Sequence, residues 1–338
     1  MPHRFPLRRF IWIVVAGILI GTFYGGVQYG TPISGATAGG QISAALFLLE
    51  LYVLRRNAGG IFRPLPFLPY LALRSLLYVT VIFIVIALPP RPPKAIESVD
   101  FLFTLVLVVG ATLLLSVNDL LGPGTLFAFA AGRYYEPRIE ERALLFIDMR
   151  SSTATAERLG ELRFLKLLNR FIIDLTLAID GTGGEIHKYV GDEMIVTWRL
   201  GSGQDEAACV RACFKVLNRL GEQAPAYERE FGVAADFRAG LHCGRVAVGE
   251  VGSRKKEIAL IGDTMNTARR IQEACRDTNH RVLASAALID RLAALPLGVT
   301  SRPLGELAVR GKERPLELYV LEADFGVGRG TVPLRDDR

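Results

Sequence analysis

The chain has few of the residues that build disulfide frameworks or metal clusters. It holds four cysteines in 338 residues, all in its second half. Cys209 and Cys213 are four residues apart in a helical pattern with no further Cys or His pair nearby, which favours core packing over a zinc site. None of the four histidines lies in a long apolar stretch, so haem held between membrane helices by paired imidazoles is not expected.

Charge is nearly absent from four stretches before residue 121. They run roughly from 10 to 29, 39 to 54, 68 to 88 and 101 to 121. A bilayer core is about 30 Å thick and needs roughly 20 apolar residues in a helix, which three of the stretches supply easily. The second crosses only if the small-residue run 34–40 is counted, and it carries Glu50 near its end. We predict a membrane domain of four transmembrane helices over residues 1–121.

A cleaved signal peptide is the alternative for the first stretch, because arginines precede it. The run is long, no clear small-x-small cleavage site follows, and three further stretches would still need an explanation, so a membrane span is favoured. Arginines also lie between the second and third stretches, whereas segment 31–40 is uncharged. By the positive-inside rule, the N-terminus and everything after residue 121 lie on the cytoplasmic side of the cell (inner) membrane.

Membrane lipid is therefore an expected partner, and nucleic acid is not. The formal charge of +6 includes the basic residues that flank the spans, where topology explains them. Glu50 and Arg74 are expected near the cytoplasmic ends of adjacent spans, where they either pair or extend separately to the interface. We favour separate snorkelling of the two side chains.

Residues 122–141 are interpreted as a connector, either a spacer or a helix that transmits membrane rearrangement. Beyond it, patterns typical of strands and helices alternate, which predicts an α/β or α+β domain over 142–325 and a flexible tail over 326–338. Strands are expected at 143–149, 185–189 and 194–198, and helices at 154–180 and 205–221. The turn 190–193 has residues that suit a hairpin.

Two carboxylates mark possible metal ligands at strand ends. Asp148 closes the first predicted strand and Asp192 lies in the hairpin turn. Mg²⁺ is usually held by one or two carboxylates plus the phosphates of its substrate, and two such ions can bind the attacking and leaving oxygens. Taken alone, the pair is a weak signal, because acidic residues are common in turns.

Four motifs occur in order: FIDMRSST, HKYVGDEM, GLHCGRVAVGEVG and LIGDTMNTARR. Together they resemble the catalytic domain of class III adenylate and guanylate cyclases. The resemblance runs from about Arg142 to Glu322 and includes VRGKERPLELYVL near the end. It implies an α+β fold with a ferredoxin-like βαββαβ core, and conversion of ATP to 3′,5′-cyclic AMP and pyrophosphate.

The resemblance also implies roles for individual residues. Asp148 and Asp192 match the two aspartates that bind two Mg²⁺ (or Mn²⁺), helped by the backbone carbonyl of Ile147. Asn266 and Arg270 match the pair that orients the ribose and stabilises the transition state. In this family the metal-bearing and transition-state residues at one nucleotide come from different subunits, so a homodimer with two shared sites is expected.

Further positions are implied to contact the rest of the substrate. Arg254 and Lys312 match residues that hold the triphosphate, the latter less securely because Arg310 is close by. Lys188 matches the position that reads the purine. Thr153 contacts phosphate or, as is commoner for a threonine there, caps the next helix.

These roles agree with the chemistry of cyclisation. The ribose 3′-hydroxyl attacks the α-phosphorus in line while pyrophosphate leaves, so negative charge builds up on oxygens that metals and an arginine can stabilise. Arg270 lies four residues after Asn266, so on a helix both can reach the same nucleotide.

Substrate choice is where the sequence departs from the family pattern. The second purine reader is usually aspartate, threonine or serine, but that position is Ala259. Lys188 can still donate to adenine N1, and the exocyclic amine would need another acceptor, such as the backbone carbonyl of Leu260. We expect ATP preference with incomplete rejection of GTP.

Three alternatives are weighed against this interpretation. A diguanylate cyclase explains an acidic hairpin turn but needs two glycines where Val190 and Gly191 stand, and it leaves LIGDTMNTARR unexplained. A guanylate cyclase of the same fold is the second. The third is a membrane receptor with a degenerate cyclase domain, which rests on Ala259 alone.

Overall fold

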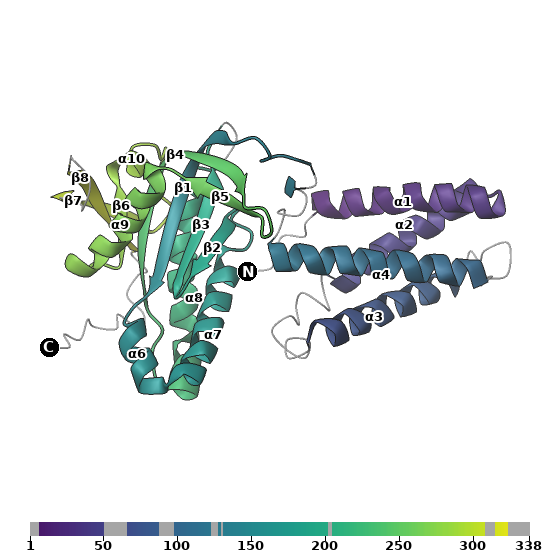
Figure 1. Ribbon diagram of the computed structural model, residues 1–338, viewed down its shortest axis with the longest axis horizontal. Coiled ribbons are helices and arrows are strands. Elements are labelled where there is room, and N and C mark those ends of the chain that lie inside the picture. Colours follow the sequence, from purple (N-terminus) through teal and green to yellow (C-terminus); the bar gives the residue numbers. More distant parts are fainter. Residues whose placement is uncertain are drawn as a thin grey trace. The chain divides into compact units, whose positions relative to one another are not determined.

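The computed structural model describes residues 7–50, 66–87, 98–122, 128–129, 131–201, 205–307 and 315–323. The chain divides into two compact units, Met1–Leu126 and Phe127–Arg338. Figure 1 shows that the first is built of helices and that the second is built around a sheet. The predicted boundaries of the connector at 122 and of the tail at 326 stay predictions.

The first unit holds four helices: α1 (Leu7–Tyr29), α2 (Pro32–Leu49), α3 (Phe67–Ala87) and α4 (Ser98–Leu121). Two segments among the described residues are long and apolar enough to cross a membrane, Pro32–Leu49 and Phe67–Val85. α1 and α4 contain shorter apolar runs, Ile13–Tyr29 and Leu102–Leu114. The second stretch reaches this length because α2 begins at Pro32, a residue favoured in the first helical turn, and so includes the small-residue run.

Glycines let α1 and α2 approach closely. A Cβ placed on Gly21 would lie 2.1 Å from the carbonyl oxygen of Gly35, and one on Gly39 would lie 2.1 Å from that of Gly17. Real Cβ atoms do not come so close to a backbone oxygen, so larger side chains would force the helices apart. The small residues of α1 thus serve packing within one chain.

Glu50 and Arg74 form an ion pair, so the snorkelling expectation is wrong. Arg74 Nη2 lies 2.8 Å from Glu50 Oε1, and Arg74 is only 2% exposed. Tyr78 donates its hydroxyl to Glu50 Oε2 at 2.5 Å. Because Arg74 is enclosed by its neighbours rather than placed at an end of α3, a nearby carboxylate satisfies it at lower cost than a long reach to water.

The second unit contains a mixed sheet of eight strands: β1 (Arg138–Met149), β2 (Glu185–Val190), β3 (Glu193–Arg199), β4 (Phe237–Val251), β5 (Glu257–Ile261), β6 (Val282–Ser285), β7 (Val299–Leu307) and β8 (Leu316–Ala323). The strand order is β2-β3-β1-β4-β6-β8-β7, with β5 paired to β4 beside β6. Only the β4–β6 pairing is parallel among the described strands.

Helices cover both faces of this sheet. They are α6 (Ser152–Leu159), α7 (Glu161–Ile179), α8 (Ala208–Phe231), α9 (Asp263–Asp277) and the short α10 (Ala286–Ile289). Alternate residues of β1, including Leu145 and Ile147, are buried in the main core with residues of α7 and α8. Cys209 and Cys213 lie in this core, which confirms their predicted packing role.

α9 covers the opposite face. Leu144 and Phe146 of β1 form a cluster there with Ile195 of β3 and Ala268 of α9. A Cβ on Gly240 of β4 would lie 2.4 Å from the backbone nitrogen of Gln272, so the helix rests directly on the strand at that glycine. This contact fixes α9 over the end of β1 where Asp148 lies.

Three element boundaries differ from those expected. β1 begins at Arg138, so residues 138–141 are strand rather than connector, paired in register with β4. The predicted helix 154–180 is two helices separated at Gly160, whose φ of 75° is incompatible with a continuing helix. α8 extends to Phe231 and contains Pro225. The hairpin β2–β3 is confirmed within one residue at each end.

Candidate active site

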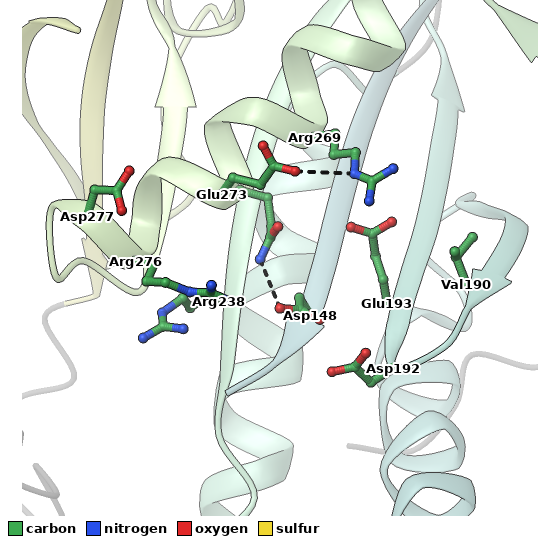
Figure 2. Close-up of a pocket in the computed structure, with 10 residues that line it drawn as sticks. Asp148, Val190, Asp192, Glu193, Arg238, Arg269, Glu273, Arg276 and Asp277 are labelled. Atoms are coloured by element: carbon green, nitrogen blue, oxygen red, sulfur yellow. Dashed lines mark hydrogen bonds and ion pairs between the residues drawn. The ribbon is translucent and has the colours of Figure 1, made fainter. Parts of the chain in front are cut away.

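Two carboxylates meet where β1 lies beside the β2–β3 hairpin. The register of β1 and β3 places Asp148 opposite Glu193, and Asp192 directly precedes Glu193 in the turn. Figure 2 shows Asp148, Asp192 and Glu193 at the same end of the sheet. Antiparallel pairing thus brings together residues that are far apart in the sequence.

The carboxylates are held in an environment that disfavours their charge. Burial, then the negative charge of Asp192 and a hydrogen bond with it, raise the pKa of Asp148 from 3.8 to about 6. Burial also raises the pKa of Glu193 to about 7, and the charges of Asp148 and Asp192 add to this while Arg269 opposes it. A nearby positive charge would therefore favour the ionised form of these three crowded acidic groups.

Basic residues line the same cavity, which has a volume of about 420 Å³ and is also bordered by the acidic residues Glu273 and Asp277. Arg238 comes from β4, where it pairs in register with Asp148, and Arg269 and Arg276 come from α9. Gln272 of α9 donates from Nε2 to Asp148 Oδ2 at 3.3 Å. Figure 2 shows this hydrogen bond and the ion pair between Arg269 and Glu273. The cavity can therefore place a polyanion between carboxylates and guanidinium groups.

The donor set fits Mg²⁺ that is bound together with a phosphate substrate. The described residues contain no group of three or more His, Cys, Asp or Glu side chains arranged to hold a metal by themselves. Mg²⁺ usually takes one or two carboxylates plus waters and substrate phosphates, which matches Asp148 and Asp192. Ile147 is fully buried with its side chain in the main core, so only its backbone carbonyl is available as a further ligand.

Asn266 and Arg270 lie on α9 but do not line this cavity. The residues of this helix that line the cavity are Arg269, Gln272, Glu273, Arg276 and Asp277. Asn266 is exposed and Arg270 is partly buried. The structure thus brings the two aspartates together and leaves the second predicted pair outside their cavity within one chain.

The predicted phosphate contacts are not gathered at the cavity. Arg254 is exposed in the loop between β4 and β5, and Thr153 is exposed inside α6. The N-cap of α6 is Ser151, which makes no side-chain capping bond, so the helix-capping interpretation of Thr153 is wrong. Lys312 lies outside the described residues.

The three predicted base contacts lie on β2 and β5. Lys188 Nζ is 3.3 Å from Glu257 Oε1. Ala259 and Leu260 are on β5, opposite Gly249 and Val248 of β4. Leu260 packs against the cluster of Leu144, Phe146 and Ile195.

Sequence reasoning missed Arg238, Gln272, Arg276 and Glu193. Five residues of α9 border the cavity, and three of them, Arg269, Gln272 and Arg276, share a spacing signal because they recur on one helix face. No sequence signal shows that this face, rather than that of Arg270, meets Asp148. Arg238 is placed by the β1–β4 register, which local pattern does not reveal.

The family model for the adenylate and guanylate cyclase catalytic domain matches residues 134–323. The chain belongs to the class III adenylate and guanylate cyclases. This class III cyclase is 37% identical over 216 residues to adenylate cyclase 2 of Rhizobium meliloti (strain 1021), a match that covers 64% of this chain and 59% of that protein. It is 24% identical over 183 residues to adenylate cyclase of Anabaena cylindrica, covering 53% of this chain and 36% of that protein.

Among solved structures, a bacterial light-regulated adenylyl cyclase has the same fold. Its TM-score to this cyclase is 0.56 at 21% identity, over 67% of this chain and 65% of the other. The cyclase spans less than two thirds of the length of the curated relatives it matches. The similarity establishes the catalytic fold.

Proposed function

We propose that this cyclase is an adenylate cyclase that converts ATP to 3′,5′-cyclic AMP and pyrophosphate as a homodimer. The observation that carries the proposal is the meeting of Asp148 and Asp192 in a cavity that is also lined by three arginines. The named relative from Rhizobium meliloti, an adenylate cyclase at 37% identity, supports ATP as the substrate.

The arrangement of α9 supports a shared site. Asn266 and Arg270 do not line the cavity that holds the aspartates of their own chain, yet both chemistries are needed at one nucleotide. In a symmetric dimer each chain supplies the aspartates to one site and the amide and guanidinium to the other. A single chain would then bind a metal nucleotide without completing either site.

Each residue has a task in the cyclisation. Two Mg²⁺ or Mn²⁺ ions, when bound, would neutralise phosphate charge and lower the pKa of the ribose 3′-hydroxyl. Asp148 and Asp192 would hold them, with the Ile147 carbonyl as a further ligand and Gln272 orienting Asp148. Arg238 and Arg276, which line the same cavity, extend the triphosphate contacts assigned to Arg254 and Lys312. Asn266 of the second chain orients the ribose, and its Arg270 meets the charge on the reacting phosphate.

GTP is the second candidate substrate, because Ala259 offers no side-chain acceptor where the family usually has one. Lys188 donates to adenine N1, and the Leu260 carbonyl is a possible acceptor for the exocyclic amine. Losing one polar partner typically weakens discrimination by about 1 to 3 kcal/mol. We therefore propose ATP preference with measurable GTP turnover.

We also propose that the four N-terminal helices anchor the enzyme in the cell membrane with its catalytic domain in the cytoplasm. The span-length helices α2 and α3 support this location, and so does the distribution of arginines around the apolar stretches. Within this helical unit, the buried ion pair of Arg74 with Glu50 avoids an isolated charge in hydrocarbon.

The test uses the purified full-length chain in detergent with Mg²⁺ or Mn²⁺ and ATP or GTP. Cyclic AMP formation by the wild type is expected, and Asp148→Ala and Arg270→Ala should each be inactive. Mixing the two variants should restore activity, because one of the two sites in a mixed dimer is intact. Arg302→Ala, which changes an exposed arginine on β7, serves as the matched control.

If the wild type forms no cyclic nucleotide from either substrate, the enzyme hypothesis is rejected and the degenerate receptor is favoured. If the wild type is active but mixing the two variants does not restore activity, the hypothesis of a shared site is rejected. Cyclic GMP as the main product would make the chain a guanylate cyclase.

A further inference from the structure

A carboxylate that the family pattern does not use lies beside the predicted purine reader. Glu257 Oε1 is 3.3 Å from Lys188 Nζ, and this ion pair joins β5 to β2. The two strands are not hydrogen-bonded to each other, since β5 pairs with β4 and β2 pairs with β3. The contact between them is therefore made by side chains.

A β-bulge determines the face of the sheet from which Lys188 projects. Ile186 pairs with Val196 and Lys188 pairs with Ile195, so His187 is an extra residue on β2. Directly opposed residues in an antiparallel pair project to the same face of the sheet. Ile195 packs on the α9 face, so the bulge puts Lys188 on that face as well. Without the extra residue, strict alternation would direct Lys188 to the α7–α8 face.

Glu257 shares its side of β5 with the position that has lost its polar side chain. Ile258 and Leu260 pack into buried clusters, so the alternate residues Glu257 and Ala259 project the other way. The side chain of Glu257 is 44% exposed and that of Lys188 is 50% exposed. Both groups are therefore within reach of a ligand, and an ion pair this exposed contributes little to stability.

We propose that Glu257, with Lys188, determines base specificity by supplying the acceptor that Ala259 lacks. This inference rests on the proposed nucleotide-cyclising function. Adenine presents a donor, the exocyclic amine, beside an acceptor, N1. A carboxylate facing the amine and an ammonium facing N1 satisfy both. Guanine presents the reverse order, an acceptor at O6 and a donor at N1, so the same pair opposes it.

The geometry requires only a small change on binding. The base enters between the two side chains, and each exchanges its contact with the other for a contact with the purine. Lys188 then donates to N1, and Glu257 accepts from the exocyclic amine. Glu257 thus accepts the hydrogen bond from the exocyclic amine, which the backbone carbonyl of Leu260 would otherwise accept.

The test compares Glu257→Ala and Glu257→Gln with wild type in the full-length protein. The readouts are kcat/KM for ATP and GTP, and the Kd values of α,β-methylene-ATP and α,β-methylene-GTP. We expect Glu257→Ala to lower the ATP-to-GTP ratio about tenfold in both readouts. Glu257→Gln keeps the shape and should lower the ratio as well, because its amide can donate to guanine O6. Glu306→Gln, on exposed β7, is the matched control.

A rescue experiment separates base recognition from a general defect. Ala259→Asp added to Glu257→Ala should restore the ratio, because positions 257 and 259 share one side of β5. Unchanged ratios in both Glu257 variants, with an active wild type, would overturn the inference and leave the proposed function standing. If the wild type forms no cyclic nucleotide, the proposed function fails and the Kd ratios of the two analogues still decide the role of Glu257. Failure of the wild type to bind α,β-methylene-ATP would overturn both.

Discussion

Gly240 is the position where a single methyl group should most clearly disturb the active site without touching it. In Gly240→Ala the new Cβ would lie 2.4 Å from the backbone nitrogen of Gln272 and 2.7 Å from the carbonyl oxygen of Ala268. Both atoms belong to the backbone of α9, so no side-chain rotation can relieve the contact. The helix must move away from β4.

The size of the effect follows from the distances. Ordinary carbon contacts are roughly 3.5 to 4 Å, so α9 must shift by about 1 Å. Overpacking of this kind typically costs about 1 to 3 kcal/mol. For a domain of this size, each kcal/mol lowers Tm by about 2 to 4 °C. The same shift displaces Gln272 from Asp148, and a misplacement of about 1 Å can cost roughly 100-fold in rate.

Gly221→Ala provides a control with the opposite sign. Gly221 lies inside α8 with nothing within 4 Å of the added Cβ, so alanine should stabilise the helix by about 0.5 to 1 kcal/mol. Thermal unfolding in detergent and cyclase activity should be measured for both variants. Equal Tm values for Gly240→Ala and wild type, together with unchanged activity, would refute the close packing of α9 on β4.

Three further predictions concern the carboxylates, Gln272 and the helical unit. The folded pKa of Asp148, about 6, lies above its ordinary value of 3.8, so in chelator its contribution to stability is complete below about pH 4 and is lost as pH rises through about 6. The loss is at most about 3 kcal/mol, which solvent screening of this partly exposed group reduces. Asp148→Asn should then be more stable than wild type at pH 7 but not at pH 4 in denaturant titrations, and parallel profiles would contradict this. Gln272→Ala should raise the Mg²⁺ concentration for half-maximal activity about fivefold by removing the donor to Asp148, and an unchanged metal titration would count against that role. Gly21→Leu should lower the Tm of the helical unit far more than Gly110→Leu, whose Cβ has nothing within 4 Å, and equal Tm values would argue against the α1–α2 contact.

The sequence was informative where chemistry and local pattern coincide. The hairpin and the burial of Cys209 and Cys213 followed from alternation and helical spacing, and the motifs indicated that Asp148 and Asp192 act together. The sequence did not reveal contacts that depend on the register between strands far apart in the chain. Arg238 faces Asp148 only because β4 pairs with β1 at that position.

The same limit applies to paired charges. Glu50 and Arg74 are each expensive in hydrocarbon, but only the packing of α2 against α3 shows that they meet. The bulge at His187 is equally invisible to pattern analysis, since one extra residue leaves the hydrophobic alternation of β2 almost unchanged. Lys312 lies outside the described residues and the dimer involves a second chain, so both stay predictions.

The register of β1 links the stability of the domain to its active site. Alternation along this strand sends Leu145 and Ile147 into the main core and Leu144, Phe146 and Asp148 toward α9. A slip of one residue would move Asp148 into the apolar core and expose Ile147, and it would separate Asp148 from both Arg238 and Glu193. The buried aliphatic residues therefore do more than stabilise the sheet. Because their burial permits only one register, the same hydrophobic pattern that folds the domain also holds the carboxylate of Asp148 between Arg238 and Glu193 at the cavity.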